Sequence, residues 1–373
     1  MKIVFSTDQI YLHGGIEKVM ALKANYFADV LNYEVTILTT EQNHKKPCYP
    51  LSSKVNLIDI EINYNRKKSY FHYSNLAKIP NHFKKWNAVL KQIKPDGLIS
   101  CNYAFDFYWI PFFKLDVKKY KEYHSSGYFE SLDKSNAGFI KKMRYKLNDF
   151  IASKYTSNII LNPDEKIYYP YKNLTVIPNP IDETPLTANL ENKTIIAAGR
   201  IASVKGFDVL IKTWQLVAQK EPLWQLHIYG QGEPDYIKML QQLIDNFQLT
   251  NQVFIKPATN NLLEVLSQHS IYVMSSNTEC FPMVLLESLA VGLPIISFDC
   301  PTGPRNIITD NEDGFLVENQ NCASLAEKIV FLIQNKTSRK AMGIKAKTNS
   351  LRFSTPKVMQ LWQNLFDSQN LKN

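Results

Sequence analysis

The stretch that decides the fold is IYVMSSNTECFPMVLLESLAVG, residues 271–292. Residues 271–274 form a short apolar run that is typical of a buried parallel strand, and residues 283–292 contain helix formers before a Gly-Leu-Pro stop. The turn between them therefore lies at the carboxyl edge of a sheet and faces a helix N-terminus. Ligands of open α/β sheets bind at that edge, because unpaired N–H groups and the helix dipole converge there.

Two glutamates lie in this stretch, Glu279 in the turn and Glu287 on the helix. Ionised carboxylates accept hydrogen bonds from hydroxyl groups, so the pair could hold different parts of one polyhydroxylated ligand. The spacing alone is a weak signal, because a solvated helix face can also carry two glutamates. The neighbours of Glu279 strengthen the ligand-binding interpretation.

Glu279 begins a Glu-Cys-Phe-Pro turn, residues 279–282. Here the sequence resembles the retaining, nucleotide-sugar-dependent glycosyltransferases of family 4, of the bacterial surface-polysaccharide and lipopolysaccharide type. The hallmark of that family is two glutamates separated by seven residues, inside a Glu-Gly-Phe-Pro-like turn. The resemblance is strong over residues 176–317 and weak before them. Cys280 stands where glycine is commonest, which leaves the identity of the donor sugar open.

The resemblance implies the GT-B architecture, two Rossmann-like parallel-sheet domains that face each other across a cleft. Independently, the alternation of strands and helices around a proline-rich joint predicts two parallel-sheet α/β domains. We expect an N-terminal, acceptor-side domain over residues 1–182 and a nucleotide-sugar-binding domain over residues 183–355. A C-terminal helix, residues 356–373, is amphipathic and could cross back to the first domain.

The resemblance also implies roles for the residues of the central stretch. Glu279 would orient the hydroxyl groups of the donor sugar during catalysis, and Glu287 would bind the ribose hydroxyls. The backbone N–H groups of Cys280, Phe281 and Met283 would reach the sugar, since Pro282 has no N–H to donate.

A basic element precedes the central stretch in the sequence. Arg200 and Lys205 lie in a loop between an expected strand and an expected helix. A guanidinium can fork across two oxygens and an ammonium acts as a mobile point charge, so the pair suits a diphosphate leaving group. The family has a similar Gly-Arg…Lys-Gly element, which gives Arg200 and Lys205 a catalytic and donor-binding role. In similar proteins the base of the donor rests against backbone near Pro257.

The N-terminal half contributes two further candidates. Gly14 and Gly15 lie between an expected strand and helix, a phosphate-approach unit that the family uses toward the donor diphosphate. The sequence there is not a Gly-x-Gly-x-x-Gly fingerprint, and no Walker lysine follows, so neither nicotinamide binding nor ATPase chemistry is supported. His124 follows an expected strand, and in similar enzymes a histidine at this place lies near the transferred sugar. A lone histidine is more often an ordinary polar residue.

The net charge of +9 is uneven, because the whole excess of Lys and Arg lies in residues 1–182. A basic helix over residues 141–155 and an aromatic segment over residues 103–113 could face a membrane or a sugar acceptor. A solvated surface and ordinary core packing are the alternatives. The five cysteines show no disulfide or zinc spacing, and no Asp-x-Asp occurs, so we expect no cofactor and no divalent metal.

The sequence therefore predicts a hexosyltransferase whose donor is a nucleotide diphosphate sugar, with a UDP-sugar favoured, and whose acceptor is a glycan or a lipid-linked glycan. Without a signal peptide or a spanning segment, the expected location is cytoplasmic, with peripheral contact of the basic N-terminal domain with anionic membrane. Nucleic acid is not expected as a partner. Two alternatives are a sugar-nucleotide epimerase of the same architecture and a non-enzymatic basic protein that binds membrane or nucleic acid.

Overall fold

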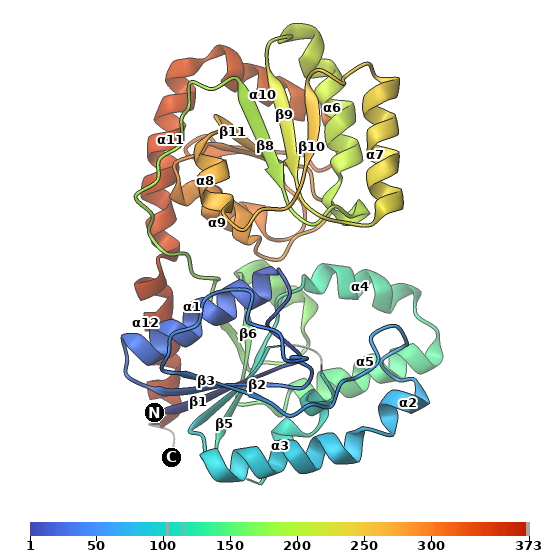
Figure 1. The fold of residues 1–373 in the computed structure, drawn as a ribbon, viewed down its shortest axis with the longest axis vertical. Helices are drawn as coiled ribbons and strands as arrows, with labels where there is room; N and C mark the ends of the chain where they lie inside the picture. The colour runs from blue at the N-terminus through green and yellow to red at the C-terminus, as the bar shows by residue number, and fades with distance from the viewer. Residues whose placement is uncertain (102–103, 115, 371–373) are drawn as a thin grey trace. The chain divides into compact units, whose positions relative to one another are not determined.

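The computed structural model describes residues 1–101, 104–114 and 116–370. The chain divides into two compact units. Unit 1 combines Met1–Pro180 with the C-terminal segment that begins at Thr355, and unit 2 is Ile181–Ser354. Each unit is a parallel sheet between helices (Figure 1), so the predicted α/β class with two Rossmann-like domains is confirmed.

The sheet of unit 1 has seven strands in the order β3-β2-β1-β4-β5-β6-β7. The strands are β1 (Lys2–Thr7), β2 (Glu34–Thr39), β3 (Val55–Asp59), β4 (Gly97–Ser100), β5 (Lys118–Glu122), β6 (Ser157–Ile160) and β7 (Leu174–Val176). The α-helices are α1 (Gly15–Asp29), α2 (Tyr73–Leu76), α3 (Ile79–Ile93), α4 (Gly127–Asn136), α5 (Phe139–Ala152) and α12 (Thr355–Asn370).

Both faces of this sheet are covered, as the three consecutive apolar residues at the centre of β1 show. Ile3 and Phe5 point into a core that includes residues of α1 and α12, whereas Val4 points into a core that includes residues of α3 and α5. Successive side chains of a strand face opposite sides, so a strand buried on both sides has no polar alternation.

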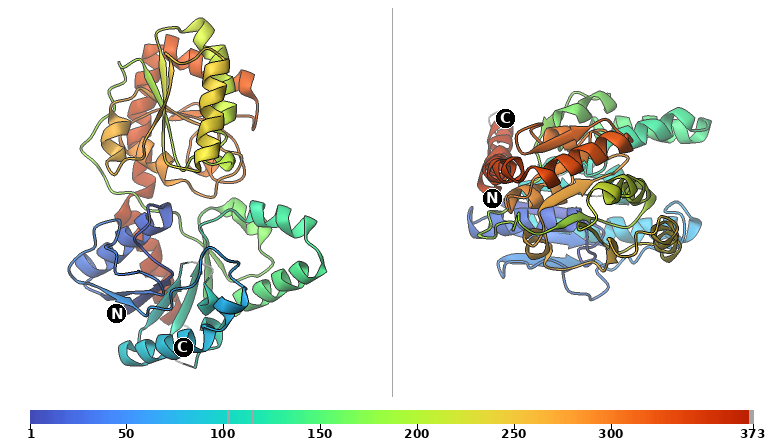
Figure 2. Two further views of the ribbon diagram at one scale, coloured as in Figure 1. Left: turned by 45° about the vertical axis from the view of Figure 1, so that its right-hand side comes forward. Right: turned by 90° about the horizontal axis from the view of Figure 1, so that it is seen from above.

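The sheet of unit 2 has six strands in the order β10-β9-β8-β11-β12-β13. The strands are β8 (Thr194–Ala198), β9 (Gln225–Tyr229), β10 (Val253–Lys256), β11 (Ile271–Met274), β12 (Ile295–Phe298) and β13 (Gly314–Val317). The helices are α6 (Phe207–Lys220), α7 (Pro234–Asn246), α8 (Leu262–Ser267), α9 (Met283–Ala290), α10 (Cys322–Gln334) and α11 (Lys336–Ser350). Helices α6 and α7 flank one side of the sheet, and α8 and α9 flank the other (Figures 1 and 2).

The central stretch folds as the sequence predicts, with one difference at its end. Residues 271–274 are β11, a fully buried strand, and α9 begins at Met283. The helix stops at Ala290, two residues before the expected end, because Gly292 adopts the left-handed conformation (φ +74°) that ends helices.

The aromatic segment expected over residues 103–113 contributes mainly to the core of unit 1. Phe105 and Phe107 are buried there, as is Ile110, whereas Phe112 is exposed. Tyr103 lies outside the described residues, as do residues 371–373 of the C-terminal helix. The ordinary packing alternative therefore holds for the buried aromatic residues of this segment.

Candidate active site

The candidate site of unit 2 lies where the strand order reverses. β8 and β11 are neighbours, while β9 and β10 continue the sheet in one direction and β12 and β13 in the other. The loops that follow two such strands diverge above the sheet and leave room for a ligand at the carboxyl ends of the strands. Arg200 and Lys205 follow β8, and Glu279 follows β11, so the fold brings the two predicted elements to this one point.

The loops after β8 and β11 are joined by backbone hydrogen bonds. Asn277 donates its N–H to the carbonyl of Val204 (2.8 Å), and the Ser275 hydroxyl donates to the carbonyl of Lys205 (3.1 Å). Gly206 lies at this contact with φ +62°, and a Cβ atom there would be 2.1 Å from the carbonyl oxygen of Ser275. Only glycine fits such an approach of two backbones.

Lys205 and Glu279 form the centre of the site. The Lys205 ammonium donates to Glu279 Oε1 at 2.6 Å, and the Ser276 hydroxyl donates to the same oxygen at 2.7 Å. The backbone of Glu279 is held as well, since its N–H donates to Pro301 (2.8 Å) and its carbonyl accepts from Gly303 (2.9 Å). The carboxylate is therefore fixed at the carboxyl edge of the sheet and paired with the cation that the sequence predicts as a diphosphate contact.

A small cavity of about 10 Å³ lies beside this pair, lined by Lys205, Ser276, Glu279 and Tyr272 among others. It has room for about one water molecule. The cavity is too small to hold a sugar or a diphosphate while Lys205 and Glu279 stay paired.

Glu287 is buried on α9, one helical turn after Met283. Burial raises the pKa of Tyr272 in β11, and the negative charges of Glu279 and Glu287 add to that effect. Both carboxylates therefore act electrostatically on one strand, although they lie on different elements.

The remaining predicted residues of unit 2 surround this centre. Arg200 is exposed and has no hydrogen-bond or ion-pair partner among the residues that the structure describes. The side chains of Cys280, Phe281 and Met283 are buried, and α9 begins at Met283. Any contact of these residues with a ligand would therefore have to come from the backbone. Pro257 is exposed and directly follows β10, at the same edge of the sheet but two strands away from β8.

Gly14 and Gly15 lie where the sequence places them, at the N-terminus of α1 in unit 1. A Cβ atom on Gly14 would come within 2.2 Å of Glu17 Oε2, so the carboxylate packs directly against this glycine. Gln9 donates to the other oxygen of Glu17 (2.6 Å), and burial raises the pKa of Glu17. The start of α1 is thus a tight, polar turn.

His124 follows β5 in unit 1, and its Nε2 lies 3.5 Å from Glu122 Oε2. Burial lowers the pKa of His124, although Glu122 acts in the opposite direction, so the ring is neutral near pH 7. Glu122 also accepts a hydrogen bond from Lys23 of α1 and lies 3.3 Å from the Cys101 thiol. Burial opposes ionisation of Glu122, but Lys23 and His124 hold its pKa below the usual value.

The residues that orient His124 were missed by the sequence reasoning. Lys23 and Glu122 are almost fully buried and lie 99 positions apart. A local signal exists for Lys23, because Met20, Ala24 and Phe27 share its helix face and belong to the core. No spacing rule connects that lysine to a glutamate at the end of a distant strand.

In residues 1–101, 104–114 and 116–370, no group of three or more His, Cys, Asp and Glu side chains is arranged to hold a metal ion. In the same part of the chain, no helix is both long and apolar enough to cross a membrane.

The fold is that of a two-unit α/β protein with a charged pair at the strand reversal of unit 2. Residues 180–349 match the family model "Glycosyl transferases group 1". An uncharacterised glycosyltransferase of Haemophilus influenzae is 30% identical and aligns with 98% of this chain and 99% of its own length. The chain belongs to the group 1 glycosyltransferase family. This confirms the predicted glycosyltransferase class.

Further relatives and structures agree. The poly(ribitol-phosphate) α-N-acetylglucosaminyltransferase of Staphylococcus aureus is 27% identical over 68% of this chain, a region that spans 51% of that enzyme. A crystal structure of a mutant S. aureus TarM in complex with fondaparinux, α-GlcNAc-glycerol and UDP superposes with a TM-score of 0.77. It covers 98% of this chain and 99% of that chain at 17% identity, and so establishes the shared GT-B fold.

Proposed function

We propose that the protein is a retaining glycosyltransferase that moves a hexose or N-acetylhexosamine from a UDP-sugar to a hydroxyl group of a glycan acceptor. The acceptor we propose is lipid-linked or belongs to a lipopolysaccharide or capsule. The observation that carries the proposal is the pairing of Lys205 with Glu279 at the reversal between β8 and β11, with Glu287 on the helix that follows.

The leaving diphosphate needs positive charge, which Lys205 and Arg200 supply in this proposal. Lys205 has a flexible four-carbon stem and can exchange its carboxylate partner for phosphate oxygens when the donor binds. Arg200 is exposed, so its guanidinium is free to form a bidentate contact with the same diphosphate oxygens. Because two cationic side chains neutralise the diphosphate, we propose that the reaction needs no divalent metal.

The release of Lys205 leaves Glu279 as an acceptor for the donor-sugar hydroxyls, while Glu287 binds the ribose hydroxyls. The backbone N–H groups of Cys280, Phe281 and Met283 add donors beside the sugar, at the start of α9. The base rests near Pro257. The bond between C1 and the diphosphate oxygen breaks, the acceptor oxygen bonds to C1 on the same face, and the acceptor proton leaves with the diphosphate.

For unit 1 we propose that Gly14 and Gly15 contact the donor diphosphate at the start of α1 and that His124 contacts the transferred sugar. A neutral His124, held by Glu122, suits a hydrogen bond to a sugar hydroxyl. We also propose a cytoplasmic location with contact at the inner face of the cell membrane.

The relatives support the donor and acceptor classes. The S. aureus relative is named for transfer of N-acetylglucosamine to poly(ribitol-phosphate), and a Bacillus subtilis relative is named as a poly(glycerol-phosphate) α-glucosyltransferase. Two structures of Anabaena HepE that share the fold contain UDP, one of them with glucose. These names favour UDP among the nucleotides and a surface polymer among the acceptors.

The test is a panel of UDP-, GDP- and ADP-sugars, assayed for thermal stabilisation and slow donor hydrolysis in EDTA. We expect one UDP-sugar to stabilise the wild type, and Glu279→Ala to lower turnover about 100- to 1,000-fold, as for loss of a transition-state hydrogen-bonding group. Glu287→Ala should weaken donor stabilisation. The anomeric configuration of the product, read by NMR, tests retention.

The matched control is Glu264→Ala, which removes an exposed carboxylate from α8 in the same unit. It should leave donor binding and turnover unchanged. Wild-type turnover in Glu279→Ala would remove Glu279 from the site, and activity that disappears in EDTA would refute the metal-independent mechanism.

A further inference from the structure

Helix α5 of unit 1 carries an apolar face that nothing in the described structure covers. Phe139 and Ile140 are 78% and 84% exposed, and Met143, Leu147 and Phe150 are all at least half exposed. Residues four apart lie above one another on a helix, so Phe139, Met143 and Leu147 follow one line, with Phe150 one turn further along. Together these five residues form one stripe, which we call the α5 stripe.

The C-terminal end of α5, and the side of the helix away from the stripe, are the parts that pack on unit 1. Ile151 and Ala152 are buried in its core, and Asn148 accepts a hydrogen bond from the Tyr108 hydroxyl (3.1 Å). Lys141 donates to Asp133 of α4 (2.6 Å), which fixes α5 against α4. A surface helix normally turns its apolar stripe inward and its polar side to water. In α5 the apolar stripe is turned outward, so core packing does not account for it.

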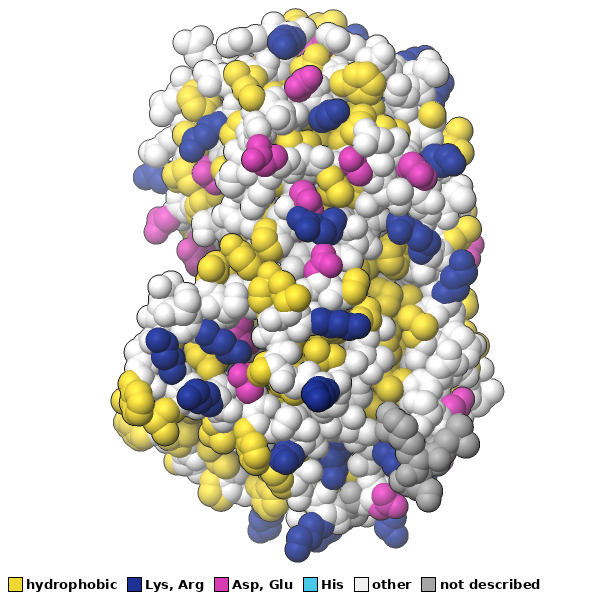
Figure 3. Space-filling model, turned by 180° about the vertical axis from the view of Figure 1, so that it is seen from behind, with side chains coloured by type: hydrophobic (Ala, Val, Ile, Leu, Met, Phe, Trp, Pro, Cys, Tyr) yellow, Lys and Arg dark blue, Asp and Glu magenta, His cyan; other side chains and the backbone are white. Residues whose placement is uncertain are grey.

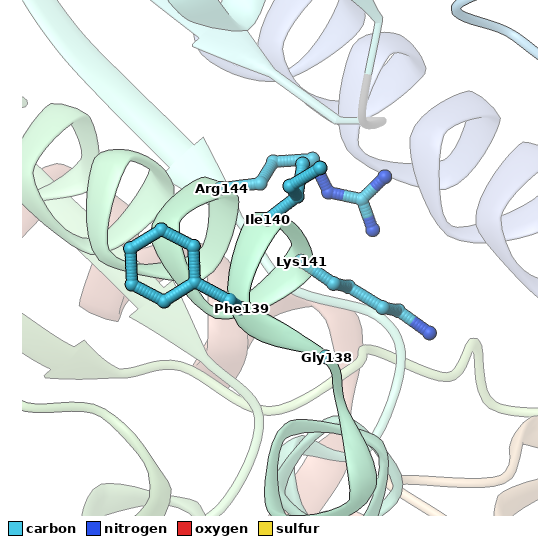
Figure 4. A pocket seen from close by; sticks show the side chains of 5 residues that line it. All are labelled: Gly138, Phe139, Ile140, Lys141 and Arg144. Atoms are coloured by element: carbon cyan, nitrogen blue, oxygen red, sulfur yellow. The ribbon is translucent and has the colours of Figure 1, made fainter.

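The surface extends beyond α5. Phe129 and Leu132, one turn apart on α4, are exposed as well. A hollow of about 560 Å³ opens at the start of α5, lined by Gly138, Phe139, Ile140, Lys141 and Arg144 (Figure 4). Figure 3 shows hydrophobic side chains gathered with Lys and Arg on the face of unit 1 at its lower left. Contiguous exposed apolar surface of this kind marks an interaction site.

Positive charge borders the α5 stripe on both sides. Lys142 and Lys146 are exposed, and by helical position they lie along one edge of the stripe. Arg144 lies along the other edge, with its guanidinium 5.4 Å from the ring centre of Phe71. Within α5 the basic residues Lys141, Lys142, Arg144 and Lys146 oppose a single acidic residue, Asp149.

We propose that α4 and α5 form a docking surface for an anionic lipid bilayer. The α5 stripe enters the boundary between headgroups and acyl chains, while Lys142 and Lys146 contact lipid phosphates. An amphipathic helix that lies in the membrane plane has this distribution of an apolar face with a cationic border. A protein partner that matched the stripe would have to supply an acidic rim around an apolar groove, whereas an anionic bilayer supplies both features without further assumption.

The proposal rests on the membrane contact proposed above and assigns it to α4 and α5. It can fail or hold independently of the transferase assignment, because it concerns a surface of unit 1 and not the residues assigned to the donor. Full-length protein is sedimented with vesicles of phosphatidylcholine, alone or mixed with phosphatidylglycerol. We expect it to bind the mixed vesicles, and to bind them less at about 0.5 M salt, where the screening length is only a few ångströms.

Two variants test the two parts of the surface. Phe139→Ser/Met143→Ser/Leu147→Ser should weaken vesicle binding more than about 100-fold, because three apolar side chains no longer enter the bilayer. Lys142→Glu/Lys146→Glu should weaken it about 10-fold or more on mixed vesicles only, because each cation near an anionic surface contributes to binding. All five side chains are partly or fully exposed, so both variants should fold.

The matched controls are Ile344→Ser and Lys345→Glu on α11 of unit 2, where both residues are exposed. They should bind vesicles as the wild type does. Absence of binding to mixed vesicles by the wild type, or wild-type binding by the triple serine variant, would overturn the proposal. So would a self-associated wild type that the triple variant converts to monomers without any vesicle binding, since the stripe would then join copies of this chain.

Discussion

Gly206 determines how closely the two loops of the candidate site approach each other. Its positive φ and the 2.1 Å that would separate a Cβ atom from the Ser275 carbonyl oxygen both exclude a larger residue. The oxygen belongs to backbone that is itself part of the turn before Glu279, so it cannot move away without moving the turn. One glycine therefore holds the loop of Lys205 against the loop of Glu279.

Gly206→Ala should accordingly destabilise the protein by about 1–3 kcal/mol, from left-handed strain plus overpacking. Urea denaturation gives the change in the free energy of unfolding. The control is Gly138→Ala, because a Cβ atom at Gly138 meets nothing within 4 Å and φ is not positive there. Equal stabilities of the two variants would show that the loops can separate at little cost.

At this scale the sequence could suggest some candidate residues and not others, for a physical reason. Arg200, Lys205 and Glu279 lie in turns after strands and Glu287 lies on the helix that follows, so short local motifs are enough to propose them. The pair of Lys23 and Glu122 leaves no such trace, because it depends on which helix packs on which strand. A buried charge pair between distant elements is visible only once tertiary structure is known.

Helix α12 shows how an element can belong to a unit that is distant in the sequence. It packs on unit 1 through Trp362 and Phe366, which contact Phe27 of α1 and Tyr120 of β5. The Lys23 ammonium lies 5.0 Å from the ring centre of Trp362. The helix thus covers the core beneath the second half of α1 and borders the charged pair next to His124.

Trp362→Ala should lower the stability of unit 1 by about 3–5 kcal/mol, because it empties a large volume in a fully buried site. Denaturation followed by near-ultraviolet circular dichroism measures the effect. Leu361→Ala, on the exposed side of the same helix, is the control and should change stability little. A small effect of both substitutions would mean that the core of unit 1 closes without α12.

Among the helices, those with clear amphipathic patterns could be predicted and the others could not. The basic helix expected over residues 141–155 is α5, Phe139–Ala152. The preceding α4 was not expected, because residues 127–136 contain Gly, Ser and Asn and show little apolar periodicity. Phe129 and Leu132 are exposed and do not form a stripe that packs on the core. The sequence of α4 therefore lacks the apolar periodicity from which a helix is predicted.

At the scale of the whole molecule, each unit contains a histidine whose pKa is lowered chiefly by burial. The pKa of His82 in unit 1 and that of His227 in unit 2 are both lowered to about 4, chiefly by burial. The unfolded chain binds these protons at a higher pH than the folded chain does. Stability should therefore be complete above about pH 6.5 and should fall as the pH drops toward 4.

His82→Gln should remove part of this acid sensitivity, at most about 3 kcal/mol between pH 7 and pH 4, because His82 is fully buried. Urea midpoints at the two pH values test the prediction. His44→Gln is the control, since the side chain of His44 is 88% exposed. An identical pH dependence in wild type and His82→Gln would show that protonation of His82 does not cause the loss of stability at low pH.

The fold class could be predicted because parallel strands and their helices follow from local apolar patterns repeated along the chain. For the partition of the chain, the sequence predicts boundaries after residues 182 and 355, and the compact units divide after Pro180 and after Ser354. How the chain pairs with itself at this joint could not be predicted. The Ile181–Ser354 bridge places both ends of unit 2 side by side. That pairing joins residues far apart in sequence, beyond the reach of local patterns.

Because unit 1 is discontinuous in the sequence, the two units differ in when each can finish folding during synthesis. The ribosome produces the seven strands of the first sheet early, but it produces α12 only after all of unit 2. Domains generally fold as units during synthesis, the earlier one first. Here unit 2, which is continuous in the chain, can finish folding before unit 1 does. Until α12 is made, the surface of the first sheet that packs against Trp362 and Phe366 stays exposed to water. We expect a chaperone that binds nascent chains to recognise this apolar surface.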